Sequence, residues 1–138
     1  MIQVILGSKG SGKTLKLIDM ANKAVGEERG NIFYIDHNNR HMYDLQREIR
    51  LVNAAEYAID SPDAFYGLLC GMLSANFDIT LIVVDGFLKI IDANIKPADL
   101  EVFFQKTDKL LSEHNVRMVI GVSGDPAEMP EFITRYAI

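Results

Sequence analysis

The stretch GSKGSGKT, at residues 7–14, matches the pattern G-x-x-x-x-G-K-[ST] at every fixed position. It follows an apolar run at residues 2–6 and opens an amphipathic segment at residues 14–25. A strand, a glycine-rich turn and a helix in this order are the context that a phosphate-binding loop requires. The stretch therefore predicts such a loop, formed by Gly7, Ser8, Lys9, Gly10, Ser11, Gly12, Lys13 and Thr14.

The residue types in this loop suit the chemistry of phosphate binding. Glycines let successive backbone N–H groups turn toward one anion. The positive end of the following helix dipole adds to that attraction. Lys13 supplies a cation for the β- and γ-phosphates, which makes it a candidate catalytic residue as well, and the Thr14 hydroxyl is placed to ligate Mg²⁺.

A phosphate loop needs a carboxylate that holds Mg²⁺, usually through water, at the end of a neighbouring parallel strand. Asp85 follows the four apolar residues 81–84 and fits this role. On its own, the same pattern is equally typical of a strand that ends in an Asp-Gly turn. Together with the loop it predicts Asp85 and Thr14 as the metal-binding residues.

Two further polar residues follow apolar strands. Asp36 comes after residues 31–35, and a turn or a helix N-cap is the favoured interpretation of it. Because strand ends of an open parallel sheet converge on the ligand crevice, Asp36 is also a candidate for contact with the γ-phosphate or an attacking water. Ser123 could likewise bond the γ-phosphate, although a turn-forming serine before Gly124 is equally well supported.

Apolar runs alternate with helical patterns, which predicts one α/β domain over residues 1–138 with a mostly parallel sheet of about five strands. Ser61-Pro62 is a strong helix start, and Asn115 a fair helix end. The expected helices cover residues 14–25, residues 40–50, and the segments after Pro62 and Pro97. The expected strands cover residues 2–6, 31–35, 49–53 and 78–87, a further strand with its exit loop covers residues 116–126, and a final edge strand is expected in residues 132–138.

Composition and charge narrow the function classes. The chain has 138 residues, a net charge of −5 and one cysteine, so a disulfide framework within the chain is excluded. The acidic balance disfavours nucleic-acid binding. A local basic patch could form from His37, Arg40, His41, Arg47 and Arg50, but charges of both signs are mixed there, so a solvated helix is the favoured interpretation. No apolar run of about 18 residues and no signal peptide is visible. We therefore expect a cytoplasmic protein without membrane insertion.

Taken together, GSKGSGKT, LIVVDG and Ser123 resemble the motifs of P-loop NTPases, and the order of elements resembles the RecA-like (ASCE) branch. The resemblance implies a three-layer fold in which the phosphate-loop strand lies centrally. It also implies that the strand ending in a polar sensor residue, here Ser123, lies between that strand and the strand bearing Asp85.

More narrowly, three segments resemble small stand-alone ATP-binding proteins of anaerobic Gram-positive bacteria, whose function is unknown. Some of these carry a twitching-motility ATPase-like label. The segments are KTLKLIDMANKAV, YIDHNNRHMYDL and VDGFLKI. A true twitching-motility ATPase is a much larger protein with a separate N-terminal domain, so the motor role does not carry over.

The chain departs from this family pattern at the residue that activates water. Many RecA-like ATPases place a glutamate directly after the metal aspartate, where this chain has Gly86. Others carry it just beyond the second strand, where Asn38 stands. Asparagine can position a water but cannot take its proton, and general-base catalysis is typically worth about 10²–10⁴-fold. The sequence predicts slow intrinsic hydrolysis unless Asp36 or a partner completes the site.

The Asn-Lys-x-Asp tetrad of guanine-specific proteins is absent, which favours ATP with Mg²⁺ by elimination. The first hypothesis is a weak ATPase or switch that acts with a protein partner or as a homo-oligomer. The second is a small-molecule kinase, although no arginine for a lid lies between Leu100 and Asn115. The third is a non-hydrolysing scaffold. Candidate trans-acting arginines are Arg40, Arg47, Arg50, Arg117 and Arg135.

Overall fold

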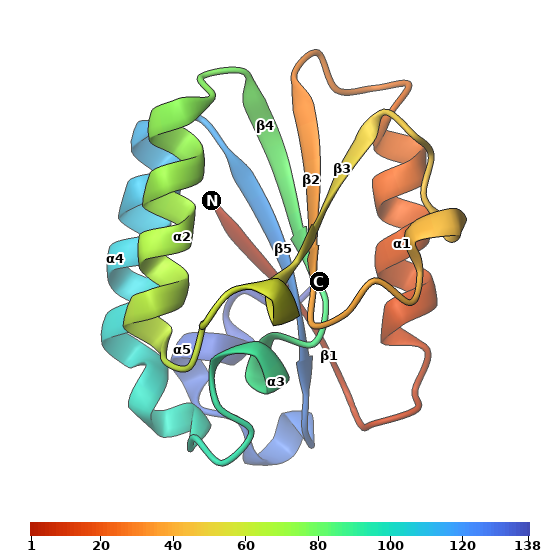
Figure 1. The fold of residues 1–138 in the computed structure, drawn as a ribbon. Coiled ribbons are helices and arrows are strands. Elements are labelled where there is room, and N and C mark those ends of the chain that lie inside the picture. The colour runs from red at the N-terminus through yellow and green to blue at the C-terminus, as the bar shows by residue number, and fades with distance from the viewer.

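A computed structural model describes all residues 1–138, and its five strands form one parallel sheet between two helical layers (Figure 1). The strand order is β1-β5-β4-β2-β3, and every pairing is parallel. The predicted α/β fold class is thereby confirmed. The strands are β1 (Ile2–Gly7), β2 (Asn31–Asp36), β3 (Ile49–Asn53), β4 (Ile79–Val84) and β5 (Arg117–Ser123).

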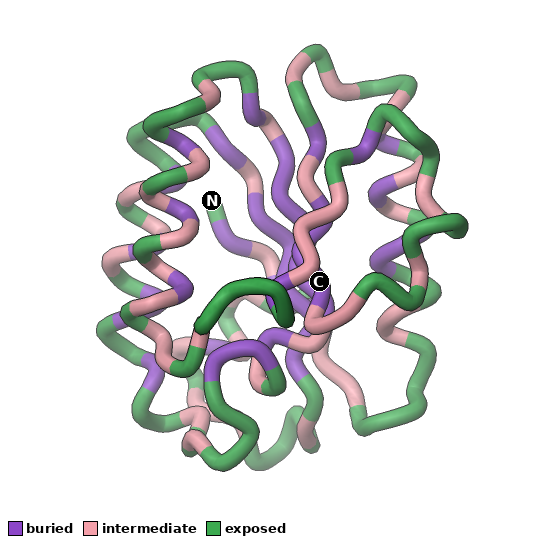
Figure 2. The backbone as a smooth tube through the Cα atoms, in the orientation of Figure 1, coloured by how far each residue is buried: buried purple, intermediate pink, exposed green.

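The helices divide between the two faces of the sheet (Figure 1). One face is covered by α1 (Lys13–Ala24), and the other by α2 (Pro62–Ala75), α4 (Glu101–Glu113) and the short α5 (Glu131–Thr134). Burial is greatest along the inner strands β2, β4 and β5, whereas Ile49 is the one buried residue of the edge strand β3 (Figure 2). The short α3 (Phe87–Ile91) lies just beyond the carboxyl end of β4. Single 3₁₀ turns occupy Met42–Asp44, Ala54–Glu56, Pro97–Leu100 and Pro126–Glu128.

Local signals in the sequence account for the helix ends. The Ser61 hydroxyl accepts a hydrogen bond from the Ala64 N–H at 3.0 Å, and Pro62 occupies the first helical position, so α2 begins where predicted. After α4, Asn115 adopts a left-handed conformation with φ of 57°. Asparagine tolerates that conformation better than most residues, which ends the helix and redirects the chain into β5.

The sheet order confirms one implication of the family resemblance and corrects another. Strand β5, which ends in Ser123, lies between β1 and β4 as expected. The expectation that β1 lies centrally is wrong, because β1 is an edge strand. Beyond it, the C-terminal residues pair only with Val4, whose N–H donates to Tyr136 and whose carbonyl accepts from Ile138.

The helix expected at residues 40–50 is wrong. The segment forms a 3₁₀ turn at Met42–Asp44 and then enters β3 at Ile49. The Asn22 side chain on α1 holds it in this form, donating to the Asp44 carbonyl and accepting from the Gln46 N–H, both at 2.9 Å. Side-chain bonding of the loop backbone thus replaces the helical ladder, and the apolar Met42 stays exposed.

The final edge strand expected at residues 132–138 is also wrong, apart from one bridge between Ala137 and Val4. Pro130 precedes the short helix α5, and the Ile133 N–H donates to the Pro130 carbonyl at 3.0 Å. Helical geometry lets Ile133 reach the core beside α4, where it is fully buried. Burial of this side chain therefore outweighs the strand preference of the segment.

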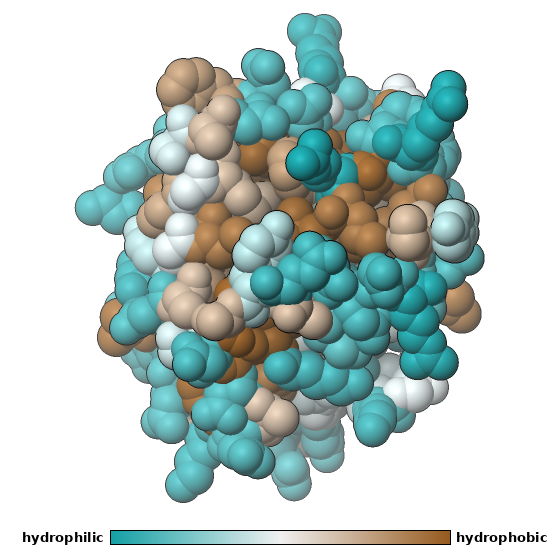
Figure 3. Space-filling model, viewed as in Figure 1, coloured by the Kyte–Doolittle hydropathy of each residue, from teal (hydrophilic) through white to brown (hydrophobic).

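One face of the molecule carries exposed apolar surface. Apolar side chains gather across the middle of the face seen in Figure 3, over β3 and alongside α2, with polar residues around them. No helix in the chain is long and apolar enough to cross a membrane.

Candidate functional site

The glycine-rich loop joins the end of β1 to the start of α1. Gly10 and Gly12 have φ values of 82° and 91°, a left-handed backbone conformation that other residues rarely adopt. The Lys13 side chain folds back over this loop, and its ammonium donates to the carbonyls of Gly7 and Ser8 at 2.9 Å each. Lys13 therefore bonds the loop itself.

A cavity of about 620 Å³ opens beside this loop. Its size is that of a typical small-molecule site. One wall is the loop and the first turn of α1; the opposite wall comes from strand ends and α3. Its polar and charged lining residues include Lys9, Lys13, Thr14, His37, Asp85, Lys89 and Ser123.

Strand alternation places the three predicted polar residues on one face. Asp36 is the last residue of β2, Asp85 directly follows β4, and Ser123 is the last residue of β5. All three side chains project toward the face that α1 covers. Asp85 is 8% exposed and lines the cavity, as does the exposed Ser123. Asp36 is 1% exposed and does not line it. The structure thus brings Asp85 and Ser123 to the cavity and places Asp36 behind it.

Sequence reasoning missed Tyr34, a fully buried residue on β2 that supports Asp85. Its hydroxyl donates to Asp85 Oδ2 at 3.3 Å. Burial raises the pKa of Tyr34, and the carboxylates of Asp85 and Asp36 raise it further, so the phenol stays a donor. Its strand position, two residues before Asp36 and on the same face, was the signal that could have identified it.

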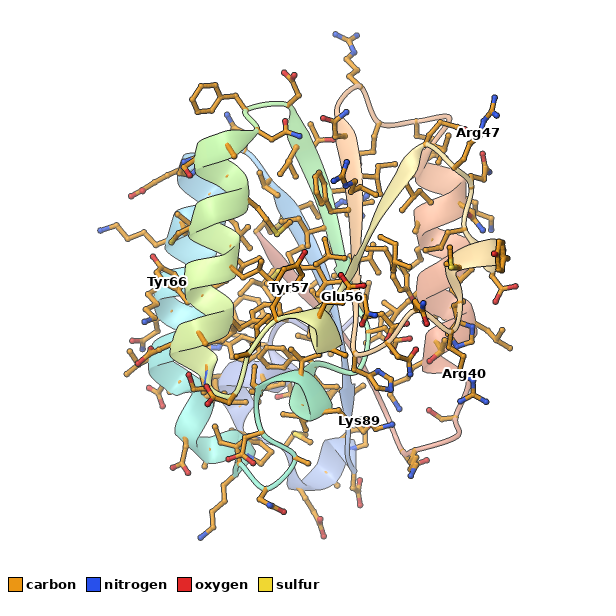
Figure 4. All side chains as sticks on the ribbon, viewed as in Figure 1. Arg40, Arg47, Glu56, Tyr57, Tyr66 and Lys89 are labelled. Carbon is orange, nitrogen blue, oxygen red and sulfur yellow. The ribbon has the colours of Figure 1, made fainter.

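A second residue missed from the sequence is Lys89, which lies on α3 and extends toward the loop side of the molecule (Figure 4). Burial lowers the pKa of Lys13; Asp85 opposes this fall, and repulsion from Lys89 adds to it. Lys9, Lys13 and Lys89 give the cavity three ammonium groups against one lining carboxylate, Asp85. This excess of positive charge suits a polyanionic ligand.

The lining residues also fit a phosphate-bound magnesium ion. No cluster of three or more His, Cys, Asp or Glu side chains could hold a metal ion by itself. Asp85 nevertheless turns a buried carboxylate to the cavity without any cation within 4.0 Å, and its one side-chain partner is the Tyr34 hydroxyl. Magnesium usually keeps several waters and takes one or two protein oxygens plus phosphates, which Thr14 and Asp85 could supply.

The candidate arginines are spread over the surface. Arg117 pairs with Glu28 at 3.2 Å at the opposite end of β5, and Arg135 pairs with Glu131 at 2.7 Å. Arg47 and Arg40 lie at different heights along the α1 side of the molecule (Figure 4). Arg40 and Arg50 have no carboxylate within 4.0 Å.

Comparison with known proteins supports the fold. The chain is similar in structure to a KaiC-like protein from the hyperthermophilic archaeon Pyrococcus horikoshii OT3, with a TM-score of 0.67 and 15% sequence identity. The similarity covers 98% of this chain and 68% of that protein. No family model and no curated protein matches the sequence. At this identity the similarity establishes a shared fold.

The buried Asp36 carboxyl gives a pH-dependent prediction for stability. Burial raises the pKa of Asp36, and the Asp85 carboxylate raises it further, against the opposing N–H and ring of His37. When the pKa of a carboxyl is raised in the folded state, its contribution to the free energy of unfolding is complete below the unfolded pKa of about 3.9. That contribution is lost as pH rises through the folded-state pKa. Asp36→Asn should therefore gain stability relative to wild type between acidic and neutral pH.

Urea unfolding at several pH values measures this difference in the free energy of unfolding. Asp60→Asn, on the exposed surface, controls for the removal of one carboxylate. A difference between wild type and Asp36→Asn that stays constant with pH would contradict the prediction.

Proposed function

We propose that the chain binds ATP with Mg²⁺ in the cavity beside the glycine-rich loop and acts as a slow ATPase or a nucleotide-dependent switch. One observation carries this proposal: the cavity combines the loop, Lys13, Thr14 and Asp85 at the carboxyl edge of a parallel sheet. Ligands of open α/β sheets bind at this edge, and a helix N-terminus there attracts phosphate.

In this proposal each residue has a distinct contact. Loop amides between Ser8 and Thr14 cradle the phosphates, and the Lys13 ammonium leaves its two carbonyl partners for the β- and γ-phosphates. Thr14 and Asp85 hold Mg²⁺, Asp85 through water, and the ion neutralises charge that develops on the phosphates. Ser123, exposed on the cavity wall, donates to the γ-phosphate.

A protein partner or a second copy of the chain would accelerate hydrolysis. An arginine supplied in trans is worth about 10³–10⁵-fold in comparable phosphoryl-transfer sites. Among the five candidate arginines, Arg40 and Arg50 are favoured, because they are exposed and no carboxylate lies within 4.0 Å of either.

Calorimetry with ATP, with and without Mg²⁺, tests the proposed ligand and the role of Asp85. Wild type should bind ATP more tightly when Mg²⁺ is present. Asp85→Asn should reduce that magnesium-dependent gain by about tenfold or more, because the metal loses its anionic contact, and should bind metal-free ATP nearly as wild type does. Asp99→Asn, on the exposed surface, serves as the matched control.

The possible results distinguish the candidate functions. Phosphate release that accelerates with protein concentration would support completion of the site by another copy. Stoichiometric transfer of phosphate to an acceptor other than water would favour the kinase. A well-folded protein that gives no binding heat with any purine nucleotide would contradict the proposed function. The scaffold hypothesis would then be the one that remains.

A further inference from the structure

The cavity contains few groups that can accept a proton. Its ionisable lining residues are three lysines, Asp85 and His37. An ammonium group has no lone pair to receive a proton, and Asp85 is committed to the metal in the proposed function. Asp36, the carboxylate expected from the sequence, is buried behind the cavity wall. His37 is the lining residue that remains.

The surroundings of His37 select one tautomer of its ring. Nδ1 is buried and lies 2.9 Å from Asp36 Oδ1, although its N–H does not point directly at that oxygen. On the other side of the ring, Asn38 Nδ2 lies 3.2 Å from Nε2. A carboxylate next to Nδ1 and an amide donor next to Nε2 both favour a ring protonated at Nδ1, with the lone pair on Nε2.

Asp36 is itself held in place to face this ring. Its Oδ1 accepts the His37 backbone N–H at 2.7 Å, while its Oδ2 is buried without a hydrogen-bond partner. The His37 side chain is 34% exposed, so the ring bridges this buried carboxylate and the cavity.

The ring also packs against the residue after Asp85. Gly86 has φ of 70°, and a Cβ atom added there would lie 2.5 Å from His37 Nδ1. The imidazole therefore occupies the space beside Gly86.

We propose that His37 accepts the proton of the attacking water and that Asp36 is its positioning residue, an inference that rests on the proposed binding of ATP. The water oxygen forms a bond to the γ-phosphorus as the bond from that phosphorus to the bridging oxygen breaks. ADP leaves with the electron pair of the broken bond, and the water proton passes to His37 Nε2. The water takes the place of the Asn38 amide at Nε2.

Nitrogen-15 NMR of the imidazole rings tests the tautomer without any nucleotide. At a pH where the rings are neutral, His37 should carry its proton on Nδ1. His114, whose Nδ1 lies 2.8 Å from the Leu110 carbonyl, provides a reference for the same tautomer. A His37 ring protonated at Nε2 would overturn the proposal, because no lone pair would face the water.

Kinetics with matched variants test the role in turnover. His37→Ala and His37→Gln should lower kcat by about 10²–10⁴-fold, while ATP affinity in calorimetry changes little. Added imidazole should restore turnover to His37→Ala, which leaves a space, and not to His37→Gln, which fills it. Asp36→Asn should lower kcat by about 10–100-fold at unchanged affinity.

The matched control is His41→Ala. His41 Nδ1 lies 3.0 Å from Asp44 Oδ2, so it is a histidine–carboxylate pair of the same kind outside the cavity, and its loss should leave kcat unchanged.

The outcomes separate this proposal from the proposed function. Wild-type protein that binds ATP but does not hydrolyse it, or a His37→Ala variant with wild-type turnover, overturns the role of His37 and leaves ATP binding intact. Loss of turnover in His37→Ala without rescue by imidazole also overturns the role as proton acceptor. Wild-type protein that binds no nucleotide overturns both.

Discussion

Replacing Lys13 by alanine is expected to weaken binding of both ATP and ADP by about 10²-fold or more. A hydrogen bond to a charged group is worth about 1.5–3 kcal/mol, and the ammonium would make at least two such bonds to the phosphates. In the structure the same ammonium bonds the carbonyls of Gly7 and Ser8, which lie at a solvent-accessible loop. Water can replace it there, so the free energy of unfolding should change by less than about 1 kcal/mol.

Calorimetry with each nucleotide, together with thermal unfolding, measures both parts of this expectation. Lys16→Ala is the matched control, since Lys16 lies on the same helix, is exposed and does not line the cavity. Equal loss of affinity in the two variants would show that net charge alone attracts the nucleotide. Unchanged affinity in Lys13→Ala would mean that the phosphates bind elsewhere.

The parts of the site that the sequence predicted belong to continuous segments. The loop at residues 7–14 carries its own context, since a strand must precede it and a helix must follow. Asp85 directly follows one apolar run and Ser123 ends another, and a parallel sheet brings the carboxyl ends of its strands to one edge. Local order along the chain therefore sufficed to place these residues at the cavity.

The residues that were missed depend on contacts between segments. In the sequence Tyr34 is an ordinary strand residue, and its role becomes evident only because the pairing of β2 with β4 brings its hydroxyl to Asp85. In the sequence Lys89 resembles any surface lysine, and its role becomes evident only because the fold places α3 across the cavity from the glycine-rich loop. The errors at residues 40–50 and 132–138 have the same origin, because Asn22 and the pocket for Ile133 lie on elements remote in sequence.

Gly86 shows how a family comparison by sequence alone can mislead. Read as a missing catalytic group, it suggests that Gly86→Glu would restore a water-activating glutamate and raise turnover. The structure predicts the opposite result. Residues other than glycine pay about 1–2 kcal/mol for a left-handed backbone, and forcing atoms into packed space costs about 1–3 kcal/mol.

Gly86→Glu is therefore expected to lower the free energy of unfolding by about 2–5 kcal/mol, because both costs apply at this position. Gly86 has φ of 70°, and an added Cβ atom would lie 2.5 Å from His37 Nδ1. This is a large share of the 5–15 kcal/mol that stabilises a typical domain. Turnover should fall as well, since the new side chain displaces the His37 ring. Urea unfolding and phosphate release measure the two effects.

A double-mutant cycle separates backbone strain from the clash. Gly86→Ala should cost about 1–3 kcal/mol less in a His37→Ala background, where the ring is gone and only the strain remains. Gly67→Ala, on α2 with no heavy atom near its added Cβ, is the control and should be neutral or stabilising by up to about 1 kcal/mol. Equal costs of Gly86→Ala in both backgrounds would show that His37 does not fill this space. A Gly86→Glu protein with wild-type stability and faster turnover would contradict the expectation for that variant and show that a glutamate here can act as the base.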